Sequence, residues 1–388
     1  MERWSVFGAK ESDIRQQDVL PTLNFQLRQQ EVQIEGSSRW RDESSEVSRD
    51  NKKESAVGRL YAAFDFWKNV LKANDFVLDI VKFGYAIPFV TLPTPCFFKN
   101  NASSLNEQEF VRREIESLLS KGYVEEIVNP AYCCNPLTVV KGKKLRLVLD
   151  LSRHVNKCVQ YCPVKYENWD LLEQVVESSD YCINWDFVAG YHHVAILPEH
   201  RKYLGFAFNW GEVTRYFKFC QLPFGLSSAC YVFTKLNRPF IKIWRNMGIR
   251  AFMYIDDGVG VFSSYQEGRR IAPIMKSHLQ QSGFLINEDK SNWEPSQSLA
   301  WLGFLFDFSN MTLSVSVIKM QKVIDLCGTL LKVQKVSPRQ IAKVVGMIIA
   351  MQKAIGQEAR FMTRYLTFWI NDMLQEQYFF EPKKIFWL

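Results

Sequence analysis

Two adjacent carboxylates, Asp256 and Asp257, interrupt an apolar stretch of the chain. β-prone residues precede them at 251–255 and follow Gly258 at 259–262. This pattern predicts a β-hairpin with both carboxylates at its tip. Neighbouring anions repel each other, and a divalent cation is the usual reason to place them together at the end of buried strands. The alternative is a solvated turn, because Asp-Gly is among the commonest hairpin sequences.

A third carboxylate, Asp186, lies within another β-prone run, residues 181–196. We expect a strand that carries Asp186 at its end and Tyr191 in its continuation. Carboxylates from separate strands can together hold two metal ions about 4 Å apart. The neighbouring His192 and His193 are not expected to form a metal site, because adjacent residues of a strand point to opposite faces.

Composition indicates a mostly globular protein. The chain has 388 residues, 47% of them hydrophobic, which is enough for two or three domains with buried cores. Its net charge of +7 suits a polyanionic partner without requiring one. No run of about 18 apolar residues and no signal-peptide core is present. We therefore expect a soluble intracellular protein that does not bind a membrane, in either nucleus or cytoplasm.

Nine cysteines, an odd number without repeated Cys-x-x-Cys pairs, favour a reducing compartment over a disulfide framework. Two pairs were considered as zinc ligands: Cys133 with Cys134, and Cys158 with Cys162. The five histidines do not fall at ligand spacing around them, so buried thiols are the favoured interpretation.

The order of expected elements predicts an α+β fold. Residues 1–57 are polar and charge-mixed and predict a flexible leader, and 58–103 predict a short helix and an extended arm. A capping-box pattern at Ser104 predicts a helix over 105–121. Further strands are expected at 139–140, 145–151, 284–290 and 299–306, with helices at 231–244, 271–282, 317–333 and 337–367. From Asp186 onward the order strand, helix, hairpin, helix, strand is typical of a ferredoxin-like layer, with helices on one face of the sheet and carboxylates on the other.

From about residue 76 to 370 the chain resembles the reverse transcriptase domain of retrotransposons. Six blocks occur in the family's order, and any one alone would be a weak signal. They lie at 135–150, 184–192, 222–226, 254–257, 283–290 and 301–304. The segments 83–89 and 359–364 look most like the DIRS-like group, which carries a tyrosine recombinase, with gypsy-like retroelements next closest. The chain departs from many relatives at Cys230, where they have proline, and its segment 151–157 is one residue longer than in retroviral enzymes.

The resemblance implies a right-hand polymerase fold with fingers, a palm built on the ferredoxin-like antiparallel sheet, and a helical thumb. Fingers and palm would span 104–315 and a thumb or connection segment 316–388, with the 58–103 arm packing on the fingers. It also implies RNA-directed DNA polymerase activity with two Mg²⁺ ions, or Mn²⁺, held by Asp186, Asp256, Asp257 and the backbone carbonyl of Phe187. The partners would be an RNA or DNA template with its primer, and deoxynucleoside triphosphates. Oligomeric state is left open.

Further roles follow from the same resemblance. Lys141, Lys143 and Arg146 would bind the triphosphate; the alternative is a solvated basic turn. Tyr191 would exclude ribonucleotides; the alternative is core packing. Lys290 would act as a general acid; the alternative is a solvated lysine. Phe224 and Gly225 would face the nucleotide and template, and Trp301, Leu302, Gly303 and Phe304 would hold the primer end.

Two other functions stay open at this stage. An RNA-dependent RNA polymerase would share the acidic hairpin and the palm, but the aromatic Tyr191 argues against it. A retroelement-derived nucleic-acid-binding protein without catalysis would not need all three carboxylates. No RNase H-like stretch is visible, so the chain is expected to be a fragment of a longer polyprotein or a truncated copy.

Overall fold

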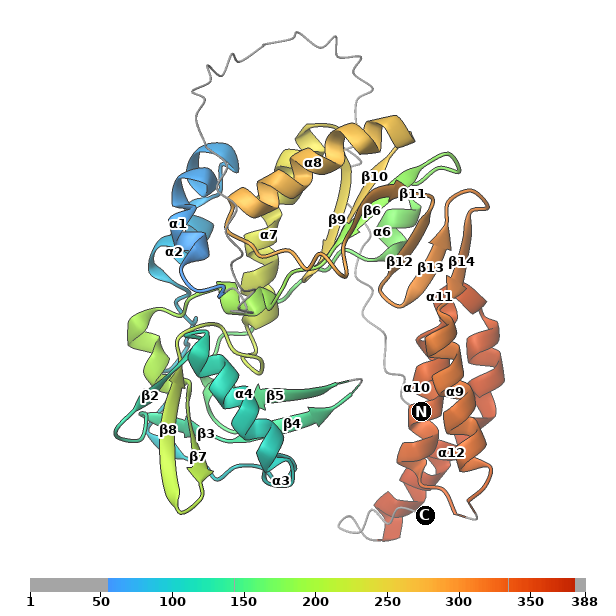
Figure 1. Cartoon of the computed structure of the whole chain (residues 1–388). Helices are drawn as coiled ribbons and strands as arrows, with labels where there is room; N and C mark the ends of the chain where they lie inside the picture. The colour runs from blue at the N-terminus through green and yellow to red at the C-terminus, as the bar shows by residue number, and fades with distance from the viewer. Residues whose placement is uncertain (1–54, 143, 334, 381–388) are drawn as a thin grey trace, which may run out of the picture. The chain divides into compact units, whose positions relative to one another are not determined.

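Figure 1 shows the computed structural model of the chain, which describes residues 55–142, 144–333 and 335–380. The expected leader lies almost wholly outside these residues. The first part contains helices and the π-helical turn η1: α1 (Arg59–Ala62), η1 (Phe66–Val70) and α2 (Asp75–Phe83). Helix α2 replaces part of the extended arm that was expected, because Asn74 caps its N-terminus by accepting from the Val77 N–H.

A five-stranded sheet with the order β1-β3-β7-β8-β2 follows. Its strands are β1 (Cys96–Phe97), β2 (Val124–Ile127), β3 (Cys133–Asn135), β7 (Gly205–Trp210) and β8 (Val213–Phe219). The helical elements of this region are α3 (Ala102–Leu105), α4 (Gln108–Ser120), α5 (Val155–Cys158), α6 (Trp169–Glu173) and the 3₁₀ turn η3 (Pro198–Tyr203).

The expected helix over 105–121 is α4, which begins three residues later at Gln108, and the capping box at Ser104 was wrong. Ser104 lies inside α3, and its hydroxyl donates to the Leu137 carbonyl, whereas α4 begins after Glu107. The end of the helix before Gly122 is confirmed, since Gly122 has a φ of +71° that suits glycine. The basic hairpin is confirmed as β4 (Leu137–Lys141) paired with β5 (Leu145–Leu149).

The ferredoxin-like layer is confirmed by the four-stranded antiparallel sheet β11-β6-β10-β9. In the chain, β6 comes first, β9 second, β10 third and β11 fourth, so the sheet order is 4-1-3-2. The elements are β6 (Tyr181–Trp185), α7 (Ala229–Asn246), β9 (Arg250–Tyr254), β10 (Asp257–Phe262), α8 (Tyr265–Gln281) and β11 (Asn292–Ser296).

Alternation along β6, β9 and β10 sends side chains into two cores. Ile183 and Met253 join the core that also contains α7 and α8, whereas Cys182 and Phe252 join a second core with α6. The second core includes a small sheet of β12 (Ser298–Trp301), β13 (Phe304–Asp307) and β14 (Thr312–Val315). The carboxylates were expected on the sheet face opposite the helices. They lie instead at strand ends, because that face is covered by the second core.

Three expected strands were wrong in extent. β6 ends at Trp185, and residues 190–193 form the 3₁₀ turn η2 (Gly190–His193), so His192 and His193 are not on a strand. Residues 284–290 make one isolated bridge, Phe187 with Ile286, and the edge strand is β11. The expected strand at 299–306 is split into a hairpin, because Leu302 and Gly303 both have positive φ.

The last part is helical, as expected, but in shorter pieces: α9 (Val317–Leu330), α10 (Pro338–Ile349), α11 (Gln352–Ile355) and α12 (Glu358–Phe380). Ser337 and Gln340 form a capping box at the start of α10. Gly356, with a φ of +71°, separates α11 from α12. No helix in the described part of the chain is long and apolar enough to cross a membrane.

The N-terminal arm packs on the ferredoxin-like layer as well as on the five-stranded sheet. The buried Trp67 indole donates to the Ser282 carbonyl at 2.9 Å and packs edge-on against Phe240. Cys96 meanwhile pairs with Cys133 in the five-stranded sheet. The arm therefore contacts both sheets.

Candidate active site

The acidic hairpin is a tight turn between β9 and β10. Asp257 pairs with Tyr254, which leaves Ile255 and Asp256 as the two turn residues. Ile255 has a φ of +57°, which is costly for a β-branched side chain. The buried Asn237 of α7 holds this turn by donating to the Ile255 carbonyl at 2.7 Å. Asn237 was missed by the sequence reasoning, although a polar residue on the apolar face of an expected helix is a usable signal.

Strand register brings Asp186 beside this turn. Trp185 of β6 pairs with Gly258 of β10, so the residues that follow and precede them, Asp186 and Asp257, are neighbours on adjacent strands. Gly258 is required here, because a Cβ would lie 2.0 Å from the Trp185 indole. Asp186 and the acidic pair are therefore brought together as expected.

The electrostatics of the three carboxylates reflect this proximity. Burial, followed by the charges of Asp256 and Asp186, raises the pKa of Asp257 to about 6. Burial is also the main cause that raises the pKa of Asp256, with Asp186 adding to it and Lys290 and Arg146 opposing it. Three anions partly removed from water are costly, and a divalent cation would relieve that cost.

A lysine lies against the first of these anions. The Lys290 ammonium donates to both carboxylate oxygens of Asp186, at 3.0 and 3.1 Å, and Asn287 donates to one of them at 3.3 Å. Among the described residues, the oxygens of the three carboxylates do not form a group within 4.8 Å of one another. Mutual repulsion and the Asp186–Lys290 ion pair both favour this spacing when no cation is present.

The backbone around Phe187 is positioned by the segment 285–287. Val188 N–H donates to the Leu285 carbonyl and Asn287 N–H to the Asp186 carbonyl, on either side of Phe187. His193 fixes the same segment, because its Nε2 accepts from the Leu285 N–H at 2.9 Å. Burial lowers the pKa of His193 to about 4, so this histidine is neutral and positions backbone. His193 is a second residue that the sequence reasoning missed.

Tyr191 lies on η2 beside the acidic turn. Its hydroxyl is 3.0 Å from the Cys230 sulfur, and its ring centroid is 5.2 Å from that of Phe224. Burial is the main cause that raises the Tyr191 pKa, and the charge of Asp256 contributes, which indicates that the two groups are close. Cys230, where many relatives have proline, thus contacts the residue expected to select the sugar.

The loop containing Phe224 and Gly225 is joined to strand β5. The Leu149 N–H donates to the Phe224 carbonyl, and Gly225 approaches so closely that a Cβ would lie 1.9 Å from the Leu149 carbonyl oxygen. Gly225 has a φ of +111°, so both sterics and backbone conformation require glycine. Phe224 is 44% exposed and available to a ligand, whereas Gly225 acts through backbone position.

The basic hairpin presents its cations unequally. Arg146 is exposed on β5, and its charge reaches Asp256. Lys141 forms an ion pair with Glu107 at 2.5 Å. Lys143 lies outside the described residues. Among the described residues of this hairpin, Arg146 is therefore the one whose charge acts on the carboxylates.

The expected primer-holding segment is a turn and not an aromatic surface. Trp301 and Phe304 are buried in the second core, where both pack against Trp169. Leu302 and Gly303 form the turn between β12 and β13, and Gly303 is exposed. Any contact from this segment to a ligand would come from the turn backbone.

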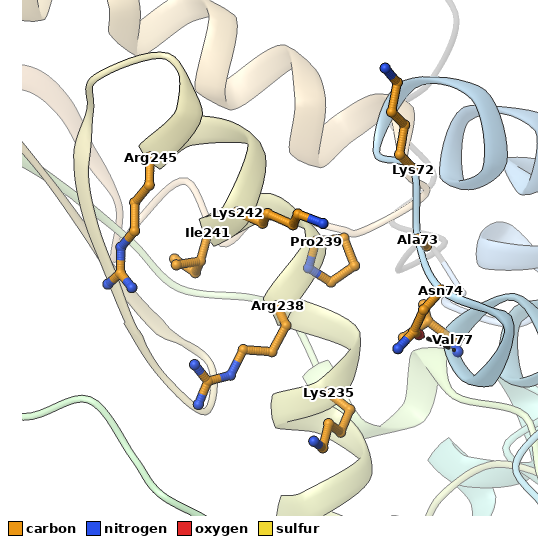
Figure 2. A pocket seen from close by; sticks show the side chains of 10 residues that line it. All are labelled: Lys72, Ala73, Asn74, Val77, Lys235, Arg238, Pro239, Ile241, Lys242 and Arg245. Atoms are coloured by element: carbon orange, nitrogen blue, oxygen red, sulfur yellow. Dashed lines mark hydrogen bonds between the residues drawn. The ribbon is translucent and has the colours of Figure 1, made fainter. Parts of the chain in front are cut away.

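A separate cavity of about 360 Å³ lies between α7 and the segment before α2 (Figure 2). Five basic side chains line it and no acidic one does: Lys72, Lys235, Arg238, Lys242 and Arg245. Arg245 is paired with Glu167, and Arg238 donates to the Lys165 carbonyl. This charge suits phosphate groups, but the cavity is not part of the acidic site.

Comparison with known proteins agrees with this geometry. Residues 141–306 match the family described as "Reverse transcriptase (RNA-dependent DNA polymerase)". This stretch, less than half of the chain, is thus similar to reverse transcriptase domains. The matched stretch contains the three carboxylates, Arg146, Tyr191 and Lys290.

A curated relative of the domain is the retrovirus-related Pol polyprotein from transposon gypsy of Drosophila melanogaster. It is 24% identical over 242 residues, which are 57% of this chain and 22% of that polyprotein. The chain therefore spans less than a quarter of the length of this relative.

Two solved structures of the foamy viral protease-reverse transcriptase are similar in fold to this chain. The complex with RNA/DNA hybrid has a TM-score of 0.58 at 18% identity and covers 74% of this chain and 36% of that one. The complex with dsDNA has a TM-score of 0.53 at 17% identity, and the match covers 73% of this chain and 61% of that one. These similarities confirm the α+β polymerase fold.

Proposed function

We propose that this chain is an RNA-directed DNA polymerase of retrotransposon origin that extends a primer 3′-hydroxyl with deoxynucleotides. The observation that carries the proposal is the strand register that sets Asp186 beside Asp257 within a reverse transcriptase domain. The foamy viral relatives bound to RNA/DNA hybrid and to dsDNA support a template and primer as partners.

The site fits a pair of divalent cations chemically. Asp186, Asp256 and Asp257 supply hard oxygen ligands, which Mg²⁺ prefers and Mn²⁺ also accepts, and the Phe187 carbonyl would add another. When bound, such ions would activate the primer hydroxyl and neutralise the leaving pyrophosphate. Asp186, Asp256 and Asp257 would together hold the ions.

The chain's own groups would position the substrates. Arg146 would pair with the triphosphate, as a guanidinium fork does, helped by Lys141 and Lys143. Tyr191 would occupy the space that a ribose 2′-hydroxyl needs, and Phe224 would contact the base. The Lys290 ammonium group would leave Asp186, contact the leaving pyrophosphate and donate a proton to it.

The proposed organisation keeps the expected domains. Fingers and palm span 104–315, and a helical thumb or connection segment begins at 316, one residue before α9. The turn Leu302–Gly303, between Trp301 and Phe304, would hold the primer end through its backbone. Assignment to the DIRS-like group rests on segments 83–89 and 359–364 and is the finer part of the proposal.

Primer extension on poly(rA)/oligo(dT) with Mg²⁺ tests the function. Wild type should extend the primer, and Asp256→Asn should reduce the rate at least about a thousandfold, because an amide is a poor ligand for a hard cation. Asp79→Asn, an exposed aspartate of α2, is the matched control and should retain activity. Equal extension by wild type and Asp256→Asn would refute catalysis by this site. Preferential use of ribonucleotides by wild type would instead indicate an RNA polymerase.

A further inference from the structure

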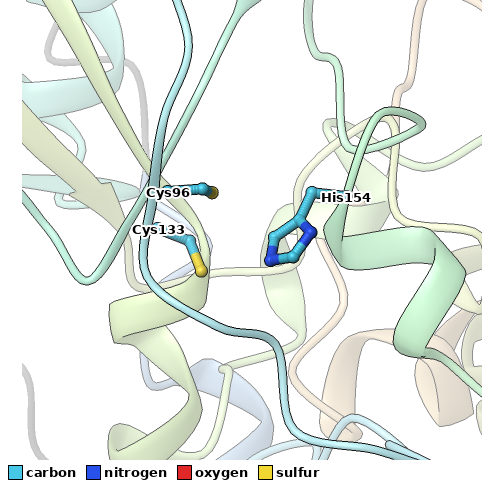
Figure 3. A group of neighbouring side chains, drawn as sticks. All are labelled: Cys96, Cys133 and His154. Carbon is cyan, nitrogen blue, oxygen red and sulfur yellow. The ribbon is translucent and has the colours of Figure 1, made fainter.

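Three potential metal ligands from distant parts of the sequence meet beside the five-stranded sheet (Figure 3). They are Cys96 of β1, Cys133 of β3 and His154, which precedes α5. One ligand atom from each lies within 4.8 Å of the other two. Cys96 and Cys133 are direct partners in the parallel pairing of β1 and β3, so their thiols project on the same side of the sheet.

The surroundings of the cluster suit a bound ion. Cys133 is fully buried, whereas Cys96 and His154 are half-buried. The cluster is therefore shielded from solvent at Cys133 and accessible to an ion from the side of the other two residues. Cys158 lies four residues after His154, at the end of α5. Its sulfur is outside the group of ligand atoms that lie within 4.8 Å of one another, so it would have to move to join them.

We propose that Cys96, Cys133 and His154 bind one zinc ion, with Cys158 or a water molecule as the fourth ligand. Two thiolates and an imidazole form a donor set that Zn²⁺ prefers over Mg²⁺. With Zn–S bonds of about 2.3 Å, tetrahedral ligand atoms lie roughly 3.8 Å apart, so the side chains need to close by only about 1 Å.

Hydrogen bonding alone is the competing account of the cluster. The Cys133 sulfur and His154 Nε2 both lie near the Thr94 carbonyl oxygen, at 3.3 and 2.9 Å. Those contacts explain why Cys133 and His154 are near each other. The pairing of β1 with β3 places Cys96 beside Cys133, so the cluster can form without an ion, and a metal-binding measurement distinguishes the two accounts.

The ion would stabilise the loop of the active site as well as the sheet. Asn156, two residues after His154, donates to the Gly225 carbonyl and accepts from the Ser227 N–H, both at 2.9 Å. A metal-bound His154 would fix the turn from which Asn156 holds this loop. The role is structural, because the ion would join β1, β3 and the 154–158 turn, which are separate in sequence.

Cobalt substitution of the reduced full-length chain tests the proposal. After EDTA treatment, Co²⁺ should bind one cluster site with a sulfur-to-cobalt charge-transfer band, which the carboxylates of the active site cannot produce. Zn²⁺ should displace the Co²⁺ and remove the band. Cys96→Ser and His154→Ala should each weaken the binding that produces the band by about tenfold or more. Cys162→Ser, another half-buried cysteine, should leave it unchanged.

Three results would overturn the zinc site. The first is no charge-transfer band in wild type, and the second is a band of equal affinity in wild type and His154→Ala, which would mean an adventitious ion only. The third is a native Cys96–Cys133 disulfide that forms in preference to metal binding in peptide mapping without reductant. Near-ultraviolet circular dichroism checks that each variant is folded. Primer extension is scored separately, so loss of the zinc site and loss of the proposed polymerase activity can be told apart.

Discussion

The ammonium group of Lys290 lies 3.0 Å from one carboxylate oxygen of Asp186 and 3.1 Å from the other. Lys290 thus neutralises the most buried member of the acidic triad, at the place where a cation would be needed. The ion pair is partly open to water, since the lysine side chain is 63% exposed. Its effect on stability should therefore be modest.

The Lys290–Asp186 pair predicts a metal-dependent change in stability. Lys290→Met should lower the free energy of unfolding by about 1 kcal/mol in EDTA, because Asp186 loses its counter-ion. Saturating Mg²⁺ should remove most of that difference, which denaturant melts with and without the ion would measure. Lys276→Met, which breaks the Lys276–Glu288 pair in the same region, is the control and should not respond to Mg²⁺ in this way. An equal Mg²⁺ response in both variants would contradict the assignment.

The raised pKa of Asp257 predicts a pH dependence. Its folded-state pKa of about 6 is above the ordinary 3.8, so this group favours folding below pH 3.8 and loses that contribution as pH rises through 6. Asp257→Asn should therefore be more stable than wild type in EDTA above pH 6, by about 1 kcal/mol after allowance for solvent screening. The difference should vanish near pH 4. Urea titrations at both pH values would measure it, and a constant difference would be the contrary result.

The same group should control metal affinity. A protonated carboxyl is a poor Mg²⁺ ligand, so the Mg²⁺ concentration for half-maximal extension should rise as pH falls below about 6. The rate at saturating Mg²⁺ should change less. A half-maximal concentration that is unchanged between pH 5.5 and 7.5 would show that Asp257 does not limit binding.

The contacts of Tyr191 predict that its ring selects the sugar. Tyr191→Val should increase ribonucleotide incorporation relative to deoxynucleotide by about tenfold or more, because it removes the ring beside Phe224. Tyr191→Phe keeps the ring and removes only the hydroxyl contact with Cys230, so it should remain selective. Ratios of kcat/KM for the two nucleotide classes measure this. Equal ratios in all three proteins would assign Tyr191 to core packing.

Gly225 and Gly211 form a matched pair. Both have positive φ, but a Cβ at Gly225 meets the Leu149 carbonyl oxygen at 1.9 Å, whereas no described atom beyond the adjacent residues lies within 4 Å of one at Gly211. Gly211→Ala should cost about 1 kcal/mol of stability, from backbone conformation alone. Gly225→Ala should cost about 3 kcal/mol or more and raise the KM for nucleotide. Thermal melts and steady-state kinetics of the two variants would measure the difference, and similar losses in both would argue against a tight loop–strand contact.

Sequence alone was sufficient for the parts of the site that depend on local order. The apolar runs around Asp256 and Asp257 specified the hairpin, and the order of elements specified the ferredoxin-like sheet, because strand and helix periodicities are local properties. Blocks in a known order likewise identified Arg146, Tyr191 and Lys290 as members of one domain.

Only the tertiary structure decided which groups touch. The prediction of a strand over 284–290 was wrong. Residues in that segment hydrogen-bond to the backbone around Phe187 and to His193, and no local sequence pattern indicates such contacts. The support that Asn237 gives to Ile255, the ion pair of Lys290 with Asp186, and the convergence of Cys96, Cys133 and His154 likewise join residues distant in sequence. Such contacts depend on sheet register and packing, and these are fixed only when the whole chain folds.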